Sequence, residues 1–233
     1  MARHAIFSAT LQAALLGGVS NVLAQLIGCY RKNTTLEVDW IPVFQFLIFS
    51  IVSTPPNFIW QQYLESTFPA RPPPPTSPSS RPTSDQKIAK PARPPQSRSQ
   101  SQSQPPPLNL RNTLLKFSLD QTLGATVNTL LFSMYIHSIH MAMPRAPRIT
   151  SFTKATGYWI SPGVIDFSAV DMGLVLEAAC AEFWTIVLAG IKLWPAVSLV
   201  NFTLVSTVEG RNLVGCIAGL GWGVYMSMIA ARS

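Results

Sequence analysis

Charge is the first thing this sequence lacks. Only 12% of its 233 residues are Asp, Glu, Lys or Arg, about half the share of roughly 25% in a typical soluble domain. Residues 71–107 hold six basic residues and one acid, so the rest of the chain carries only +2 of the total charge of +7. Too few charges remain to cover a water-exposed surface. The composition therefore excludes a soluble globular enzyme.

Signatures of catalysis and metal binding are missing as well. The sequence has no Walker loop, no Rossmann glycine fingerprint, no HExxH and no nucleophile elbow. Its three cysteines are far apart and form no CxxC, which argues against a disulfide framework or a metal site. Glu177 and Glu182 are five residues apart and do not share a helix face, while His137 and His140 have no carboxylate near them in the sequence. We expect no catalytic residues, no cofactor and no metal ion.

What the sequence does contain is long uncharged stretches. Four of them, each of about 20 residues or more, are residues 5–30, 40–64, 121–144 and 212–231. About 20 apolar residues of helix cross the hydrocarbon core of a bilayer, and only helices or closed barrels satisfy their backbone groups there. Two further apolar stretches are residues 172–191, which contain Glu177 and Glu182, and the shorter residues 193–208. These lengths predict an all-α transmembrane bundle of four core spans with an extra short or interfacial helix.

A Pro/Ser/Gln-rich segment separates the spans into two groups. Residues 71–107 hold 12 of the 20 prolines and almost no apolar side chains, so we expect residues 70–110 to be a disordered, basic linker. Residues 1–69 then contain the first two transmembrane helices, and residues 111–233 contain the others. The linker has no aromatic residues between its basic ones, which argues against nucleic acid as a partner.

Several amide and hydroxyl side chains interrupt the apolar stretches. Such groups are costly against lipid, so we expect them to face the protein interior. There they either form hydrogen bonds between helices or line a water-filled pore, and the sequence leaves both interpretations open. The candidates for a pore lining are Asn21, Gln25, Asn128, Ser198 and Asn201.

Glycines recur every four residues in the last stretch. Gly215, Gly219 and Gly223 fall on one helix face, a pattern that lets two membrane helices approach closely. We expect this face to serve helix packing, and a homo-oligomer joined through it is one candidate arrangement.

One segment resembles a family signature. Trp194 and Pro195, followed by Asn201 and Phe202, match the Trp-Pro and Asn-Phe pairs of the Mpv-seventeen/peroxisomal-membrane-protein family. The sequence continues with three further residues in the family's order: Arg211, Trp222 and Tyr225. Weaker matches in the same order extend back to about residue 10. The chain departs from the family pattern where it has Asn21 in place of an acid, Ser198 in place of glutamine and Ser206 in place of proline.

The resemblance implies a small integral membrane protein of the mitochondrial inner membrane or, alternatively, of the peroxisomal membrane. Members of the family are described as weakly selective channels. We therefore expect a passive channel for small hydrophilic solutes, embedded in the lipid bilayer, with Asp120 and Arg211 near span ends either as charged mouths or only as capping or pairing groups. Two alternatives remain: a non-transporting scaffold or assembly factor, and a coupled transporter that uses Glu177 and Glu182.

Overall fold

The computed structural model describes residues 2–71 and 107–230, and every regular element among them is a helix. Most of the predicted disordered linker lies outside these residues. The α-helices are α1 (Ala2–Arg31), α2 (Trp40–Thr67), α3 (Leu110–Leu119), α4 (Ala125–Ala142), α5 (Phe152–Trp159), α6 (Met172–Gly190), α7 (Trp194–Thr203) and α8 (Val208–Ala230). A π-helix, η1 (Asp120–Gly124), joins α3 to α4, and a 3₁₀ turn, η2 (Phe167–Ala169), precedes α6. The all-α prediction is confirmed.

Three of the described helices are long and apolar enough to cross a membrane. The stretches that meet this criterion are Arg3–Arg31 in α1, Trp40–Thr67 in α2 and Met172–Gly190 in α6. The first two coincide with the predicted spans at residues 5–30 and 40–64. Helices α4 and α8 cover most of the predicted spans at residues 121–144 and 212–231. The protein is therefore an integral membrane protein.

Short polar side chains fix where the helices begin. Asp39 caps α2 by accepting a hydrogen bond from the Ile41 amide at 3.1 Å, and the same oxygen accepts one from the Ile149 amide at 3.1 Å. Asp171 caps α6 through the Gly173 and Leu174 amides, at 2.8 and 3.2 Å. Each carboxylate satisfies amide donors that have no partner within the first turn. Asp39 also ties the loop that follows α4 to the start of α2.

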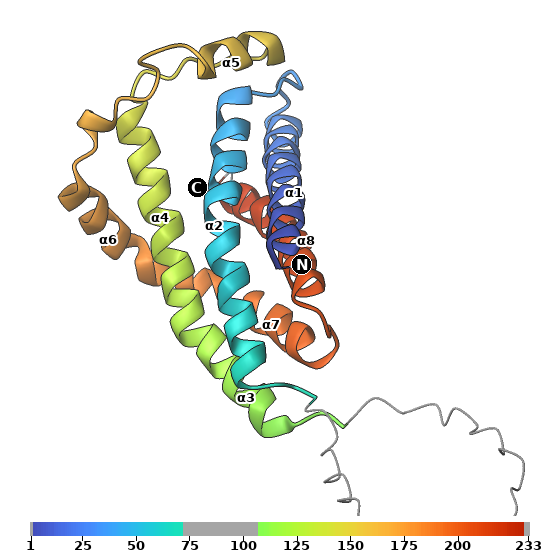
Figure 1. Cartoon of the computed structure of the whole chain (residues 1–233). Coiled ribbons are helices and arrows are strands. Elements are labelled where there is room, and N and C mark those ends of the chain that lie inside the picture. The colour runs from blue at the N-terminus through green and yellow to red at the C-terminus, as the bar shows by residue number, and fades with distance from the viewer. Residues whose placement is uncertain (1, 72–106, 231–233) are drawn as a thin grey trace, which may run out of the picture.

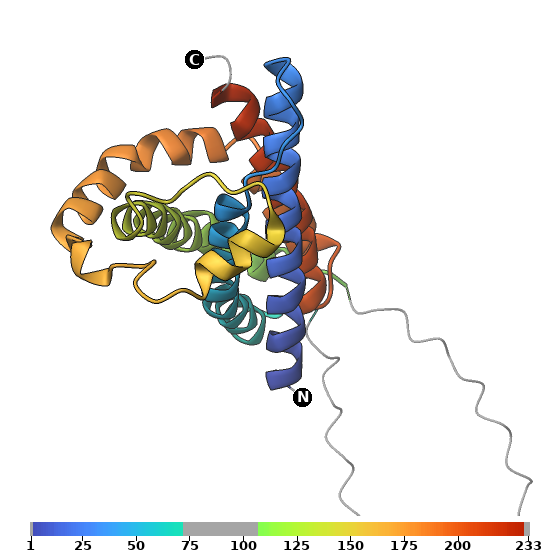
Figure 2. The same cartoon turned by 90° about the horizontal axis from the view of Figure 1, so that it is seen from above.

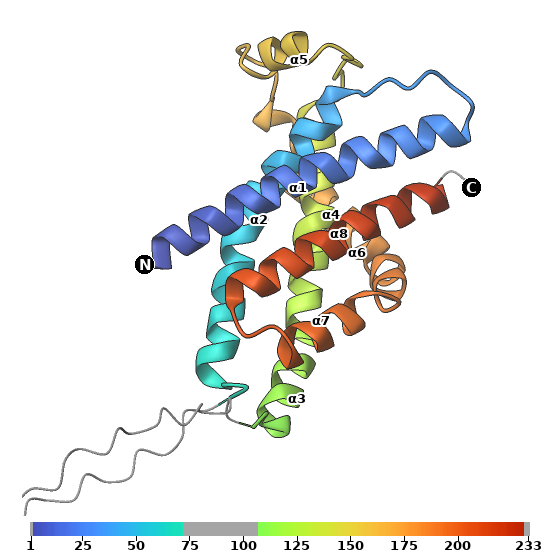
Figure 3. The ribbon, with the colours of Figure 1, turned by 90° about the vertical axis from the view of Figure 1, so that its right-hand side faces the viewer.

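Helices α1 and α8 lie side by side and cross α2 and α4 obliquely (Figure 3). The Asn212 side chain donates to the Ala9 carbonyl at 3.3 Å, and a Cβ on Gly223 would lie 2.7 Å from the Ser20 Oγ. Both pairs are separated by 203 residues. The constant separation means that α1 and α8 run parallel, in register over at least three turns.

Helix α2 lies alongside the continuous run of α3, η1 and α4 (Figure 1), and α6 packs chiefly against α4. Viewed from above, the segment that holds α6 curves around α4 on the side away from α1 (Figure 2). Large apolar side chains on the outer surfaces of α1 and α6 are exposed, among them Phe7, Leu15, Trp184 and Leu188. Lipid covers such surfaces in a membrane protein.

Candidate functional site

A cluster of buried charges lies at the end of the bundle where α2 ends and α3 begins. The side chains of Lys116 and Arg211 are 0% and 2% exposed, and both face the Glu65 carboxylate. Glu65 Oε2 is 2.7 Å from Lys116 Nζ and 2.6 Å from Arg211 Nη1, while Glu65 Oε1 accepts from the Ala70 amide at 3.1 Å. One carboxylate therefore joins three segments, α2, α3 and α8.

The two cations also enclose an aromatic ring of α7. Lys116 Nζ lies 5.1 Å from the centroid of the Phe202 ring, and the Arg211 guanidinium carbon lies 5.3 Å from it. Both distances are within the range of cation–π attraction. Arg211 Nε further donates to the carbonyls of Asn201 and Val205, at 3.1 and 3.0 Å. Arg211 thereby satisfies one carbonyl in the last turn of α7 and one in the α7–α8 turn, which it holds in place.

A second carboxylate, Asp120, begins the π-helix beside this cluster. It accepts hydrogen bonds from Gln61 Nε2 at 2.9 Å and from Ser198 Oγ at 2.8 Å. A Cβ on Gly124 would lie 2.9 Å from Trp60 Nε1 and 3.3 Å from Asp120 Oδ1. Glycine at this position thus leaves room for the Trp60 indole of α2 and for the Asp120 side chain. Short π-helices recur at functional sites, and this one brings α2 and α7 to the same carboxylate.

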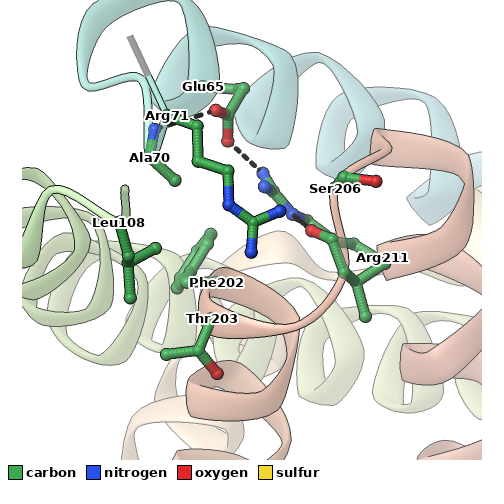
Figure 4. A pocket seen from close by; sticks show the side chains of 9 residues that line it. Glu65, Ala70, Arg71, Leu108, Phe202, Thr203, Ser206 and Arg211 are labelled. Atoms are coloured by element: carbon green, nitrogen blue, oxygen red, sulfur yellow. Dashed lines mark hydrogen bonds and ion pairs between the residues drawn. The ribbon is translucent and has the colours of Figure 1, made fainter. Parts of the chain in front are cut away.

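A pocket of about 140 Å³ opens beside the charged cluster (Figure 4). It lies between the end of α2, the α7–α8 turn and the residues that lead into α3. The polar groups on its walls are Glu65, Arg71, Thr203, Ser206 and Arg211, and Phe202 forms part of its apolar wall. The buried ion pair is thus accessible from this pocket.

A separate ionisable group lies within the apolar helix α6. Glu182 Oε2 is 3.2 Å from His137 Nε2 and 3.3 Å from the Ser133 hydroxyl, both on α4. The Glu182 side chain is 53% exposed. The histidine that has no acidic neighbour in sequence therefore has one in space, 45 residues away.

The predicted pore-lining residues fall in different places. Asn21 and Gln25 interact with each other at the end of α1, where Gln25 Nε2 donates to Asn21 Oδ1 at 2.8 Å. Gln25 also exchanges two hydrogen bonds of 2.8 Å with the backbone of Asp39. This pair holds the loop between α1 and α2 and lies far from the charged cluster.

Ser198 and Asn201 lie at the cluster, whereas Asn128 is exposed on α4. Ser198 donates to Asp120, as described, and Asn201 Nδ2 donates to the Arg211 carbonyl at 3.3 Å. Asn201 Oδ1 is buried without a hydrogen-bond partner among the described residues. Of the two predicted charged mouths, Arg211 forms an ion pair with Glu65, and Asp120 accepts hydrogen bonds from neutral side chains.

Sequence reasoning did not single out Glu65 or Lys116 as site residues. A usable signal was nevertheless present: Glu65 directly follows the uncharged residues 40–64, Lys116 precedes residues 121–144, and Arg211 precedes residues 212–231. The end of one span and the start of the next lie on the same side of a membrane, so charges flanking those ends are candidates for pairing. For Arg211, the sequence does not show whether it lies on the same side of the membrane as Glu65 and Lys116.

The glycine face is only partly covered. Gly223 faces Ser20 of α1, whereas a Cβ on Gly215 or Gly219 would meet nothing within 4 Å in the described part of the chain. Three of the aromatic residues of the predicted motif, Trp194, Trp222 and Tyr225, form a cluster of their own, whereas Phe202 lies at the charged cluster. Trp222 has its ring centroid 6.3 Å from Trp194 and 5.5 Å from Tyr225.

A scan against family models matches residues 171–227 to the Mpv17 / PMP22 family. The resemblance to this family is thus confirmed over residues 171–227. The matched residues comprise α6, α7 and most of α8, and they include Ser198, Asn201 and Arg211. Searches of curated proteins and of solved structures gave no significant match.

Proposed function

We propose that the protein is a weakly selective passive channel for small hydrophilic solutes across an organelle membrane. The observation that carries this proposal is the polar pocket above the buried pair of Glu65 and Arg211. Charged groups are costly to bury in a membrane protein and mark pathways for polar solutes when they meet a water-accessible opening. The pocket gives such an opening at one end of the bundle.

Hydrogen-bonding groups beside the pocket can replace part of a solute's hydration shell, as pores do in general. The buried Asn201 Oδ1 is available for this because no described residue donates to it. Ser198, three residues earlier on α7, is 4% exposed and reaches the carboxylate of Asp120. Asn201 and Ser198 thus lie on the inner face of α7, with Ser198 further from the pocket.

The test is conductance of the purified full-length protein in planar bilayers. We expect conductance above empty-bilayer controls, and we expect Asn201→Leu to change it because an apolar side chain removes a hydrogen-bonding group from the pathway. Ser198→Ala gives a second, smaller alteration in case Asn201→Leu does not fold. Thr156→Val in α5, outside the candidate spans, is the matched control and should leave conductance unchanged.

Absence of conductance in folded protein would overturn the channel proposal. If the protein also forms a stoichiometric complex with a partner under crosslinking and native mass measurement, the scaffold alternative is supported instead. The two outcomes are separable, because a channel conducts in a bilayer that contains no partner.

A second candidate function, coupled transport, is favoured by the contact of Glu182 with His137. An ionisable pair within membrane helices is a candidate proton relay. Uptake into proteoliposomes driven by a proton gradient, and lost in Glu182→Gln, would support this function. Equal uptake with and without the gradient would contradict it.

The proposed location is the mitochondrial inner membrane, with the peroxisomal membrane as the alternative. It rests on the family and on Arg3 in an N-terminal region without acidic residues before Glu37. A fluorescent tag at the C-terminus, imaged beside markers of both organelles, distinguishes the two.

A further inference from the structure

Positive charge predominates around the pocket at the end of α2. Arg71 and Arg211 lie on its walls with Glu65, and Lys116 lies directly behind Glu65. Three cations therefore lie at this end of the bundle with one carboxylate. The excess favours a negatively charged occupant, since clefts lined by one sign of charge attract the opposite sign.

The carboxylate itself is already engaged. Both oxygens of Glu65 are used: Oε2 contacts Lys116 and Arg211, and Oε1 accepts from the Ala70 amide. Glu65 thus neutralises part of the buried charge, and it forms no ion pair with Arg71 within the described part of the chain.

Arg71 and Ser206 have unused donors. Neither side chain makes a hydrogen bond or ion pair within the described part of the chain. Figure 4 shows the Arg71 side chain extending into the pocket, with its guanidinium between Phe202 and the guanidinium of Arg211. The Ser206 hydroxyl comes from the α7–α8 turn on another wall. The pocket therefore presents donors from two directions.

We propose that this pocket binds a phosphate group, either of a soluble phosphate compound or of a lipid head group. A guanidinium matches the oxygens of phosphate in two parallel hydrogen bonds, and the Ser206 hydroxyl can donate to a third oxygen of a tetrahedral group. The volume of about 140 Å³ is roughly ten times what one water molecule requires, so four oxygen atoms fit.

If the ligand is a soluble phosphate compound, the inference rests on the proposed channel function and narrows the class of solutes that the channel carries. A phosphate site at the mouth of the pathway makes phosphate-bearing solutes the favoured class, with Arg71 as the residue that selects them. In its lipid form the pocket holds an anionic head group at the membrane surface.

The first experiment measures thermal unfolding of the full-length protein in a detergent without phosphate groups, followed by tryptophan fluorescence. Inorganic phosphate is titrated against chloride at matched ionic strength. A ligand that binds the folded state raises the unfolding temperature. We expect phosphate to raise it for the wild type, and we expect Arg71→Gln to weaken the apparent affinity about tenfold or more, since hydrogen bonds to charged groups are strong. Ser206→Ala should weaken it by a smaller factor.

The matched control is Arg148→Gln. It removes the same charge from an exposed arginine, which pairs with Glu37 at 3.5 Å near the loop between α1 and α2. The control variant should respond to phosphate as the wild type does. An equal loss in both variants would mean that net charge alone attracts the anion, and it would overturn the proposal.

The second experiment identifies the source of the phosphate. The same variants are placed in bilayers of phosphatidylcholine with and without phosphatidic acid. Stabilisation by phosphatidic acid that requires Arg71, without a response to inorganic phosphate, assigns the pocket to a lipid head group. No response to either probe overturns the proposal.

Conductance measured on the same preparations separates this inference from the channel proposal. A conducting wild type that does not respond to phosphate overturns the phosphate site and leaves the channel proposal intact. If the protein does not conduct but responds to phosphate in a way that depends on Arg71, the phosphate site is supported and the channel proposal is overturned.

Discussion

Glu65 and Glu182 are both carboxylates on long apolar helices, and their surroundings differ. Glu65 is 28% exposed and interacts with two cations and a backbone amide that come from three segments. Glu182 is 53% exposed, and its partners among the described residues are His137 and Ser133, both on α4. The first carboxylate holds three segments together, whereas the second joins α6 to α4 alone. The two carboxylates therefore differ in how many segments of the chain each one connects.

The largest expected effect is that of Glu65→Gln. The change leaves the fully buried Lys116 and the nearly buried Arg211 without a counter-charge. Removing one partner of a buried ion pair costs about 3–5 kcal/mol, and we expect a loss of that order in the free energy of unfolding. Denaturant titration in detergent micelles measures it.

The control for this variant is Glu37→Gln, whose exposed pair with Arg148 should contribute less than about 1 kcal/mol. The double variant Glu65→Gln with Lys116→Met should recover part of the loss, because it also removes one unpaired cation. Equal losses in Glu65→Gln and Glu37→Gln would show that the cluster is not a buried unit.

A smaller effect is expected of Gly124→Ala in the π-helix. The new Cβ would lie 2.9 Å from Trp60 Nε1, and the rigid indole cannot move aside without disturbing α2. Overpacking of this kind costs about 1–3 kcal/mol. The control is Gly157→Ala in α5, where a Cβ meets nothing within 4 Å in the described structure. There alanine should stabilise the helix by about 0.5–1 kcal/mol, so the two substitutions should differ in sign.

The α1–α8 contact gives a weaker effect. In Gly223→Ala the Cβ would lie 2.7 Å from Ser20 Oγ, a small group that can rotate, so we expect a loss of about 1 kcal/mol or less. Gly219→Ala meets no described neighbour and should be neutral or stabilising in the monomer. Sedimentation of both variants at several protein-to-detergent ratios completes the test. Dissociation of an oligomer in Gly219→Ala would show that a second copy covers this face.

The smallest effect is expected of Glu182→Gln. Glutamine retains a hydrogen-bond acceptor for Ser133, so the substitution weakens only the contact with His137, at a cost of about 1 kcal/mol, which is typical of one hydrogen bond. We expect unfolding in micelles to change by no more than this. A loss as large as that of Glu65→Gln would contradict the distinction between the two carboxylates.

The sequence predicted the helices best where a single property decides them. The uncharged residues 5–30 and 40–64 lie within α1 and α2. A helix that crosses a bilayer needs about 20 consecutive apolar residues, and such a stretch is visible in the sequence itself. The π-helix at residues 120–124 was not predicted. Its Gly124 lies against Trp60 of α2, and hydropathy carries no information about which helix lies opposite.

The candidate site was predicted only in part. Ser198, Asn201 and Arg211 lie at the charged cluster, while Asn21 and Gln25 join the loop before α2 and Asn128 is exposed. The sequence shows that a span contains polar groups. Which of them meet depends on how each helix is rotated and tilted against its neighbours, and that is a property of the packed bundle.

The sequence by itself determined that this chain is helical and lies in a membrane, because long uncharged stretches have no other way to satisfy their backbone in lipid. Only the tertiary structure decided which charges pair. Lys116 is 51 residues from Glu65, and Arg211 is much further along the chain. They reach the same carboxylate because α2, α3 and α8 converge at one end of the bundle, and desolvation there allows a buried charge to persist only with a partner.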